Sequence, residues 1–165
     1  MAEKARRRRR YQLFDRDVNE PGAVARVKGE PLEPPTTCRY CQGQVELVNN
    51  AQFYGGKPFG WPLAYCCSGC GARVGTHDGT DIPLGTLANP ATMKARRQAH
   101  AAFDALHKDR TAWDRTQAYR TLARLLGRRE VHIAWLDEAE CKRVVEFCEG
   151  GAIMPGVMQR GGARP

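Results

Sequence analysis

Two pairs of cysteines constrain this chain more than any other feature of its sequence. The pairs are Cys38–Cys41 and Cys67–Cys70, and the 25 residues 42–66 separate them. A Cys-x-x-Cys turn brings two thiolates toward one point, and four thiolates suit a tetrahedral zinc ion. The separation exceeds the about 15–20 residues that are usual between such pairs. The spacing therefore predicts a four-cysteine zinc ribbon of short β-hairpins, with one hairpin loop extended around Gly55.

Other chemistries that use paired cysteines fit the pattern less well. A thioredoxin-like redox site needs one Cys-x-x-Cys in a βαβ setting, which this region lacks. An iron–sulfur cluster also takes four cysteines and remains an alternative. With thiolates at all four positions, the site is expected to bind one structural Zn²⁺ and to keep no open coordination position. Such a metal stabilises the fold and catalyses no reaction.

Three of the seven cysteines lie outside this set. An odd number excludes a fully paired disulfide framework and favours a reducing compartment. Cys66 could replace Cys67 through a wider spacing to Cys70, but the tighter spacing favours Cys67 as ligand and Cys66 as a packing residue. Cys141 and Cys148 are seven positions apart on a predicted helix, about 10.5 Å along its axis. That separation is too long for a shared metal or a disulfide, so core packing is expected.

The net charge of +8 is concentrated in two segments. Residues 1–10 carry +5 and residues 94–129 carry +7, whereas residues 130–149 carry −4. This distribution suits a polyanionic partner, although basic arms also serve as import signals and arginine-rich helices are often simply solvated. The arginines expected to contact nucleic acid are Arg6, Arg7, Arg8, Arg9, Arg10, Arg96, Arg97, Arg120, Arg124, Arg128 and Arg129.

The fold class predicted from these patterns is α+β, a zinc ribbon followed by a small three-helix unit. The expected segments are a disordered basic arm over 1–19, a proline-rich linker over 20–37, the ribbon with its following loop over 38–88, a helical unit over 89–149 and a flexible glycine-rich tail over 150–165. The prolines of the linker are expected to disfavour helix. The strand candidates of the ribbon are the runs VELV, QFYGG, WPLAYC and ARVG.

Local signals define the three helices. Asn89 followed by Pro90 is a favourable start for the first, and the second is expected from about Thr111 to Leu126, ending at Gly127. The alternation of apolar residues over 131–135 predicts a short strand or an extended link. The third helix is expected to run to about Cys148. It is opened by a capping box between Asp137 and Glu140.

The sequence indicates catalytic residues only weakly, and it excludes a membrane-spanning segment. His77 beside Asp78 is the best candidate for catalysis, but it lacks a nearby nucleophile or second carboxylate, so a polar turn residue is the simpler interpretation. No apolar run approaches the about 18 residues of a membrane span, and none follows the basic N-terminus as in a secretory signal. We expect a cytoplasmic protein.

Four stretches are distinctive as a set: CRYCQGQVELV, WPLAYCCSGCGARVGTHDGTDIPLGTLAN, KARRQAHAAFD and HIAWLDEAECKRVV. They resemble a small zinc-finger family of unknown function found in bacteriophages and bacteria, over about Cys38 to Val145. The resemblance implies a phage or prophage origin and supplies no activity. Arg39 stands where many relatives would carry a proline. The metal ligands that the resemblance implies are Cys38, Cys41, Cys67 and Cys70.

Three function classes follow from these features. The first is a non-enzymatic protein that binds DNA or RNA mainly through phosphates, with Tyr40, Phe53 or Tyr54 either stacking on bases or filling a thin ribbon core. The second is an adaptor that docks on host transcription or translation machinery, for which the acidic segment 130–149 offers a surface. The third and least favoured is a nuclease that uses His77 and Asp78.

Overall fold

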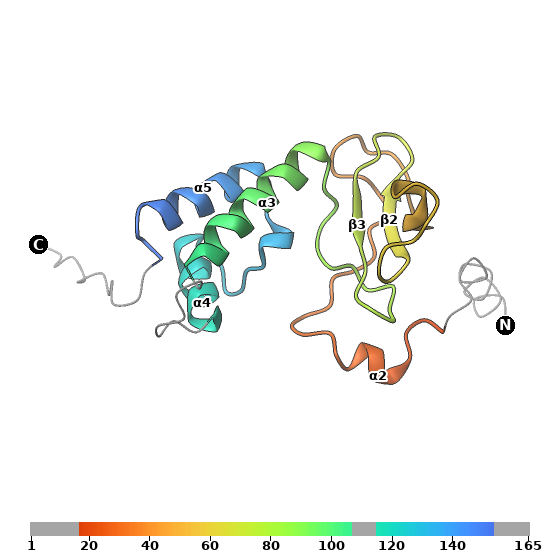
Figure 1. The fold of residues 1–165 in the computed structure, drawn as a ribbon, viewed down its shortest axis with the longest axis horizontal. Coiled ribbons are helices and arrows are strands. Elements are labelled where there is room, and N and C mark those ends of the chain that lie inside the picture. The colour runs from red at the N-terminus through yellow and green to blue at the C-terminus, as the bar shows by residue number, and fades with distance from the viewer. Residues whose placement is uncertain (1–16, 107–114, 154–165) are drawn as a thin grey trace, which may run out of the picture. The chain divides into compact units, whose positions relative to one another are not determined.

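The computed structural model describes residues 17–106 and 115–153, which form two compact units divided between Pro90 and Ala91 (Figure 1). The first unit holds a small antiparallel sheet, and the second is helical. The predicted α+β class, with a cysteine cluster followed by helices, is confirmed. The arginines of the basic arm, Arg6 to Arg10, lie outside the described residues, as does most of the glycine-rich tail.

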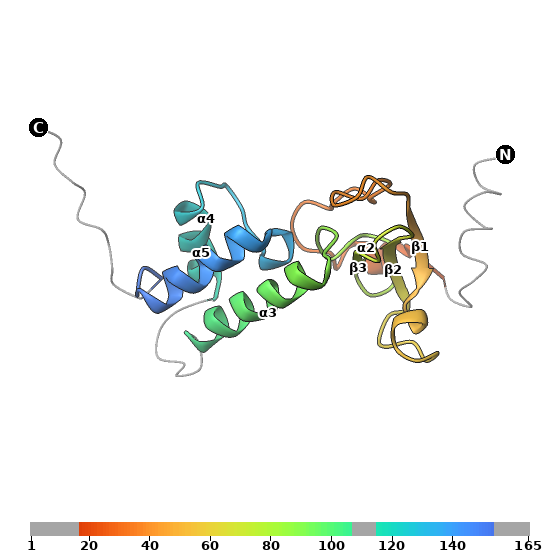
Figure 2. The same ribbon diagram turned by 90° about the horizontal axis from the view of Figure 1, so that it is seen from above.

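Three strands pair in the order β1–β2–β3 (Figure 2). The strands are β1 Val45–Asn49, β2 Leu63–Cys67 and β3 Arg73–Gly75, which confirms the strands expected at VELV, WPLAYC and ARVG. Successive side chains of a strand point to opposite faces, so the register decides which residues share the core. Val45 lies opposite Cys67, and Tyr65 pairs with both Leu47 and Val74. The core of this unit consists of Cys38, Val45, Leu47, Leu63, Tyr65, Cys67, Ala72 and Leu87.

The connection between β1 and β2 is a structured loop. The strand expected at QFYGG is wrong, because Asn50–Phe53 forms a 3-10 helix, η1. The side chain of Asn49 accepts a hydrogen bond from the N–H of Ala51 at 2.9 Å and so starts this turn. Gly55 and Gly56 then take positive φ values of 67° and 88°, which strand residues do not adopt. The long interval between the cysteine pairs lies in this loop, as expected, and Figure 2 shows it extending from the ends of the strands.

A short helix occupies part of the predicted linker. Helix α2, Pro21–Val24, begins with its proline, whose missing N–H costs nothing in the first turn. Proline was expected to disfavour helix here, and this position is the exception. Ala23 is buried. The Asn19 side chain donates to Oδ1 of Asp81 at 2.8 Å and accepts from the N–H of Asp81 at 3.1 Å, so this segment packs on the loop after β3.

The second unit contains α3 Pro90–Ala105, α4 Arg115–Leu125 and α5 Glu138–Glu149. The start predicted for α3 at Pro90 is confirmed, whereas the start expected at Thr111 for the next helix lies outside the described residues. The strand or extended link expected over 131–135 is wrong, since Ile133–Trp135 forms a 3-10 turn, η2. No helix of the described segments combines the length and the apolar composition needed to cross a bilayer.

Hydrogen bonds define two of the predicted helix boundaries, the end of α4 and the start of α5. After α4, the N–H of Arg128 donates to the carbonyl of Ala123 at 2.8 Å, and Gly127 has a φ of 69°. That pairing is a Schellman motif, which glycine completes because it adopts positive φ without strain. Before α5, the N–H of Glu140 donates to Asp137, and the Glu140 side chain accepts from the N–H of Asp137. The capping box is therefore confirmed.

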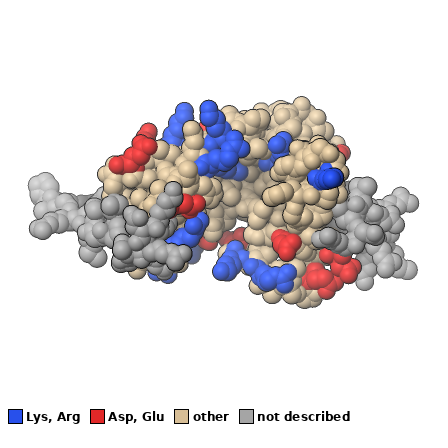
Figure 3. All heavy atoms as spheres, viewed as in Figure 1, with Lys and Arg blue, Asp and Glu red and all other residues tan. Residues whose placement is uncertain are grey.

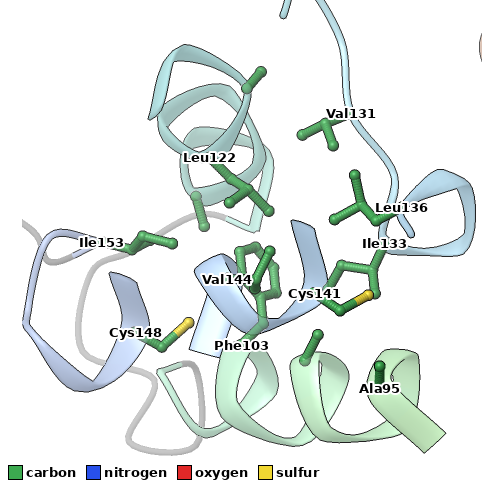
Figure 4. Packing of buried hydrophobic residues seen from close by; sticks show 13 residues of the cluster. Ala95, Phe103, Leu122, Val131, Ile133, Leu136, Cys141, Val144, Cys148 and Ile153 are labelled. Atoms are coloured by element: carbon green, nitrogen blue, oxygen red, sulfur yellow. The ribbon is translucent and has the colours of Figure 1, made fainter. Parts of the chain in front are cut away.

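One apolar core joins the three helices (Figure 4). Phe103 from α3, Leu122 from α4 and Val144 from α5 converge in it, and each is fully buried. Cys141 and Cys148 lie in the same core, as predicted. Burial raises the pKa of both thiols to about 11. Because the thiolate is the reactive form, these two cysteines are packing residues and not nucleophiles.

Leu122→Ala should destabilise the helical unit by about 2–5 kcal/mol, because it leaves a cavity between Phe103 and Val144. Thermal or urea unfolding followed by circular dichroism measures this loss. Gln117→Ala, an exposed change on the same helix, is the control and should alter stability by less than about 0.5 kcal/mol. Equal unfolding curves for Leu122→Ala and the wild type would contradict the described core.

Candidate metal centre

Two turns of similar geometry hold the four cysteines. In the first, the N–H of Cys38 donates to the carbonyl of Gly43 at 2.8 Å, and the N–H of Gln42 donates to the carbonyl of Cys38 at 2.9 Å. In the second, the N–H of Cys67 donates to the carbonyl of Ala72 at 2.8 Å, and the N–H of Gly71 donates to the carbonyl of Cys67 at 3.0 Å. The two Cys-x-x-Cys segments are thus the same turn used twice.

The two turns bring their sulfur atoms together. The Sγ atoms of Cys38, Cys41, Cys67 and Cys70 all lie within 4.8 Å of one another. The Sγ atoms of Cys38 and Cys70 are 3.5 Å apart, and those of Cys41 and Cys67 are 3.4 Å apart. A tetrahedron with Zn–S bonds of about 2.3 Å has sulfur–sulfur edges of about 3.8 Å. The donor set and its spacing therefore fit one structural Zn²⁺, as the sequence predicts.

Backbone N–H groups point at every sulfur atom of the cluster. Tyr40 donates to Cys38 at 3.4 Å. The further N–H donors are Gly43 to Cys41, Gly69 and Cys70 to Cys67, and Ala72 to Cys70. An N–H donor favours the charged form of a thiol. The N–H of Cys70 is the largest influence on Cys67, whose pKa is lowered to about 6.

The four thiols cannot all lose their protons at this spacing without a cation. For Cys70, the Ala72 N–H lowers the pKa, but burial and the three neighbouring thiols outweigh it and raise the pKa to about 12. Like charges this close disfavour one another, and a divalent metal offsets them. Zinc, when bound, supplies that charge and holds the two turns together.

Glycines near the cluster serve two different needs. Gly71 follows the second cysteine pair and has a φ of 71°. The corresponding position after the first pair is Gln42, with a φ of 60°. A Cβ atom on Gly43 would lie 3.2 Å from Sγ of Cys41 and 3.3 Å from Sγ of Cys67. A side chain at Gly43 would therefore crowd the sulfur atoms of both turns.

Cys66 lies on the other face of the sheet. In the register it pairs with Glu46 and with Arg73, and its side chain is half-buried. Burial raises the pKa of the Cys66 thiol. Cys67 and not Cys66 joins the sulfur cluster, because adjacent strand residues face opposite sides.

The residues considered for catalysis are not brought into a second cluster. His77 is half-buried in a turn where its N–H donates to the carbonyl of Ile82 at 2.8 Å, and Asp78 is exposed. Over residues 17–106 and 115–153, the four cysteines are the group of His, Cys, Asp and Glu side chains close enough to share a metal. The pair His77 and Asp78 is not part of such a group.

The predicted phosphate-binding arginines divide into two groups. Arg97, Arg120, Arg124 and Arg129 are exposed. Arg96 is half-buried, with its Nε donating to the carbonyl of Leu136 at 2.9 Å. Arg128 forms an ion pair with Glu140. Figure 3 shows Lys and Arg side chains gathered along one edge of the helical unit.

The aromatic residues considered for base stacking differ in how far their rings are exposed. Tyr40 packs on the ribbon core and donates its hydroxyl to the carbonyl of Leu87 at 3.1 Å. Phe53 lies beneath the guanidinium of Arg73, 4.6 Å from the ring centroid. Of the three residues, Tyr54 is exposed. Sequence reasoning missed Phe59, which is more exposed and whose position between Pro58 and Gly60 in an extended loop was the available signal.

Cys38→Ser should abolish stoichiometric zinc binding and unfold the ribbon, because three thiolates leave the ion and the turn incompletely held. Cys66→Ser should keep one zinc per chain, since Cys66 faces away from the cluster. Metal analysis of the purified variants measures both. Loss of zinc from Cys66→Ser, or its full retention in Cys38→Ser, would contradict the ligand assignment.

Gly43→Ala should weaken zinc binding, because the added methyl crowds two sulfur atoms. Competition with a chromogenic chelator measures the affinity. Gln42→Gly is the matched control at the adjacent position. It relieves a positive φ that costs a side-chain residue about 1 kcal/mol, so zinc binding should equal or exceed that of the wild type.

Comparison with protein-family models matches residues 34–150 to a family described as a zinc-finger-containing domain. Comparison with curated proteins and with solved structures found no match for the chain. The family match covers more than half of the sequence and includes the four clustered cysteines as well as α3, α4 and α5. Residues 17–33, with α2, precede it. The chain therefore belongs to the DUF3268 family of zinc-finger-containing domains.

Proposed function

We propose that this chain is a non-enzymatic zinc-ribbon protein that binds DNA or RNA mainly through phosphate contacts. The observation that carries the proposal is a set of exposed arginines on α3 and α4, two helices whose one acidic residue, Asp104, is paired with Arg115. We further propose the cytoplasm of a bacterial host, with a phage or prophage source, because a reducing compartment keeps free thiols available to the metal.

Helix α4 offers the clearest surface. Its buried face consists of Ala118, Leu122 and Ala123. Gln117, Arg120 and Arg124 are exposed, at positions i, i+3 and i+7, so they share the face away from the core. No acidic residue occurs from position 115 to position 129. A row of cations with no interspersed carboxylates attracts a phosphate backbone.

Helix α3 repeats the arrangement. Lys94, Arg97 and Gln98 are exposed, opposite a buried face that includes Ala95 and Ala99. The single acidic residue of α3 is Asp104, whose Oδ1 forms an ion pair with Nη1 of Arg115 at 2.9 Å. Arg97, Arg120 and Arg129 form no ion pair within the described part of the chain. Exposed cations of this kind attract a phosphate backbone.

Two of the predicted arginines should contribute less. Arg96 uses its Nε for the carbonyl of Leu136, and the charge of Arg128 is already offset by Glu140. Contacts between arginines and phosphates position the nucleic acid without reading its base sequence. The proposed binding is therefore weakly sequence-specific and strongly dependent on salt. We expect the basic arm over 1–19 to add to it.

Arg120→Ala combined with Arg124→Ala should weaken nucleic-acid binding and flatten its salt dependence. Removing one phosphate-binding cation lowers the slope of log K against log salt by about 0.7–0.9. Fluorescence anisotropy titrations over a series of salt concentrations measure both quantities. Arg143→Ala on α5 is the control, because that guanidinium donates to the carbonyl of Leu125 and lies near Glu146 and Glu149 in sequence.

Wild-type affinity that barely changes between low and high salt would contradict the proposal. So would equal effects of the α4 double substitution and Arg143→Ala. Cleavage of nucleic acid by the wild type that is lost in His77→Ala would instead establish the nuclease alternative, which the proposed closed, all-thiolate zinc site disfavours.

The adaptor alternative rests on the acidic segment 130–149. Part of its charge is used within the unit, because Glu140 both caps α5 and pairs with Arg128. Glu146 and Glu149 remain exposed. A pull-down from bacterial lysate, with and without nuclease, separates the two functions. Host proteins that stay bound after nuclease treatment would favour the adaptor.

A further inference from the structure

The loop between β1 and β2 presents two aromatic side chains to solvent. Phe59 is 75% exposed and Tyr54 is 54% exposed, the highest fractions among the large hydrophobic residues of the described segments. Their ring centroids lie 5.7 Å apart, with the ring planes inclined by 51°. The fold gains little from rings that stay in water, since hydrophobic stabilisation comes from burial. The exposed pair is therefore a candidate recognition element.

Hydrogen bonds hold the backbone under these rings. The buried Asn50 side chain donates from Nδ2 to the carbonyls of Phe59 at 2.8 Å and Trp61 at 3.0 Å, and its Oδ1 accepts from the N–H of Phe59 at 3.1 Å. The N–H of Tyr54 donates to the carbonyl of Ala51 at 3.1 Å. Both aromatic residues sit on a backbone ordered in advance, which lowers the entropy cost of binding.

The charge around the rings suits a polyanion. Residues 50–62 contain no acidic residue and include Lys57, which lies between the two aromatic residues in sequence. Arg73 lies at the base of the loop over the ring of Phe53. Aromatic rings flanked by cations, without carboxylates, are the composition of platforms that bind single-stranded nucleic acid.

We propose that Tyr54 and Phe59 stack on unpaired bases, so that this loop selects single-stranded over double-stranded nucleic acid. The inference rests on the proposed function and names its substrate class. In a duplex the faces of the bases are covered by their neighbours, and only a single strand can turn a base onto a protein ring.

The geometry of the pair requires a flexible strand. Rings inclined by 51° cannot both lie parallel to one base or to one continuous stack. Each ring therefore takes its own base, and the two bases are splayed apart. Every base has a flat face, so this contact discriminates the strandedness of the ligand and not its sequence.

Three substitutions at one position test the stacking. With the full zinc-loaded chain, the probes are oligothymidylate, oligouridylate and a blunt DNA duplex of equal length. Phe59→Ala should lower affinity for the single strands by roughly 5- to 150-fold, the loss expected for one stacked base, and should leave duplex binding unchanged. Phe59→Trp should retain single-strand affinity, because it keeps a ring. Phe59→Leu should lose it, because it keeps apolar surface without a ring face. Tyr54→Ala should behave like Phe59→Ala.

Salt titrations separate this loop from the arginine surface. Phe59→Ala should leave the slope of log K against log salt unchanged, whereas Arg120→Ala should flatten it. Leu84→Ala is the matched control, since Leu84 is 49% exposed in the same unit but outside the loop. It should bind every probe like the wild type. Equal zinc content in all variants shows that the ribbon stays folded.

The outcomes distinguish the two proposals. A wild type that binds neither single strands nor duplex overturns the proposed function and this inference with it. A wild type that binds, but whose Phe59→Ala and Tyr54→Ala variants bind equally well, overturns this inference alone. Full binding by Phe59→Leu also overturns it, because the contact is then an apolar one of the kind a protein partner uses. Preference for one single-stranded probe identifies DNA or RNA as the source of the bases.

Discussion

Four thiolates that share one divalent cation set the arrangement of the first unit. Each Cys-x-x-Cys turn directs backbone N–H donors at its sulfur atoms. The metal joins a turn before β1 to the turn between β2 and β3, so it ties together segments that are far apart in sequence. Cys38 and Cys67 are also core residues of this unit. Metal binding and core formation are therefore one event, as in other small zinc-stabilised domains.

The helical unit is stabilised by different means. It contains no metal-binding group among its described residues, and its core is formed by side chains from three helices, from the segment between α4 and α5 and from Ile153. Its helix ends carry a Schellman motif and a capping box, which satisfy backbone groups that would otherwise need water. Burial and capping stabilise this unit without ion pairs from Arg97, Arg120 or Arg129 among its described residues. Exposed arginines on α3 and α4 can then be carried at little cost to folding.

Sequence reasoning succeeded where a local signal decides the structure. The cysteine spacing, the proline at the start of α3, the glycine after α4 and the capping box before α5 each act within a few residues, and each was predicted. It failed where the outcome depends on distant contacts. The loop at 50–62 is folded back by the Asn50 amide, which donates to carbonyls nine and eleven positions away. Helix α2 forms in a proline-rich segment that packs on the loop around Asp81. The crowding at Gly43 also depends on a distant residue, because a Cβ atom there would lie 3.3 Å from Sγ of Cys67 in the other turn.

The two units would contribute to the proposed activity by different physical interactions. Arginines on a helix face act through long-range electrostatics, which tolerate imprecise placement and supply most of the affinity for a polyanion. Stacking needs a ring at a fixed height and angle, and misplacement of about 1 Å removes much of the contact. The rings of Tyr54 and Phe59 belong to the unit that metal and Asn50 hold in one conformation. Zinc would thus serve the proposed recognition indirectly, because it would fix the β1–β2 hairpin whose loop carries the two rings.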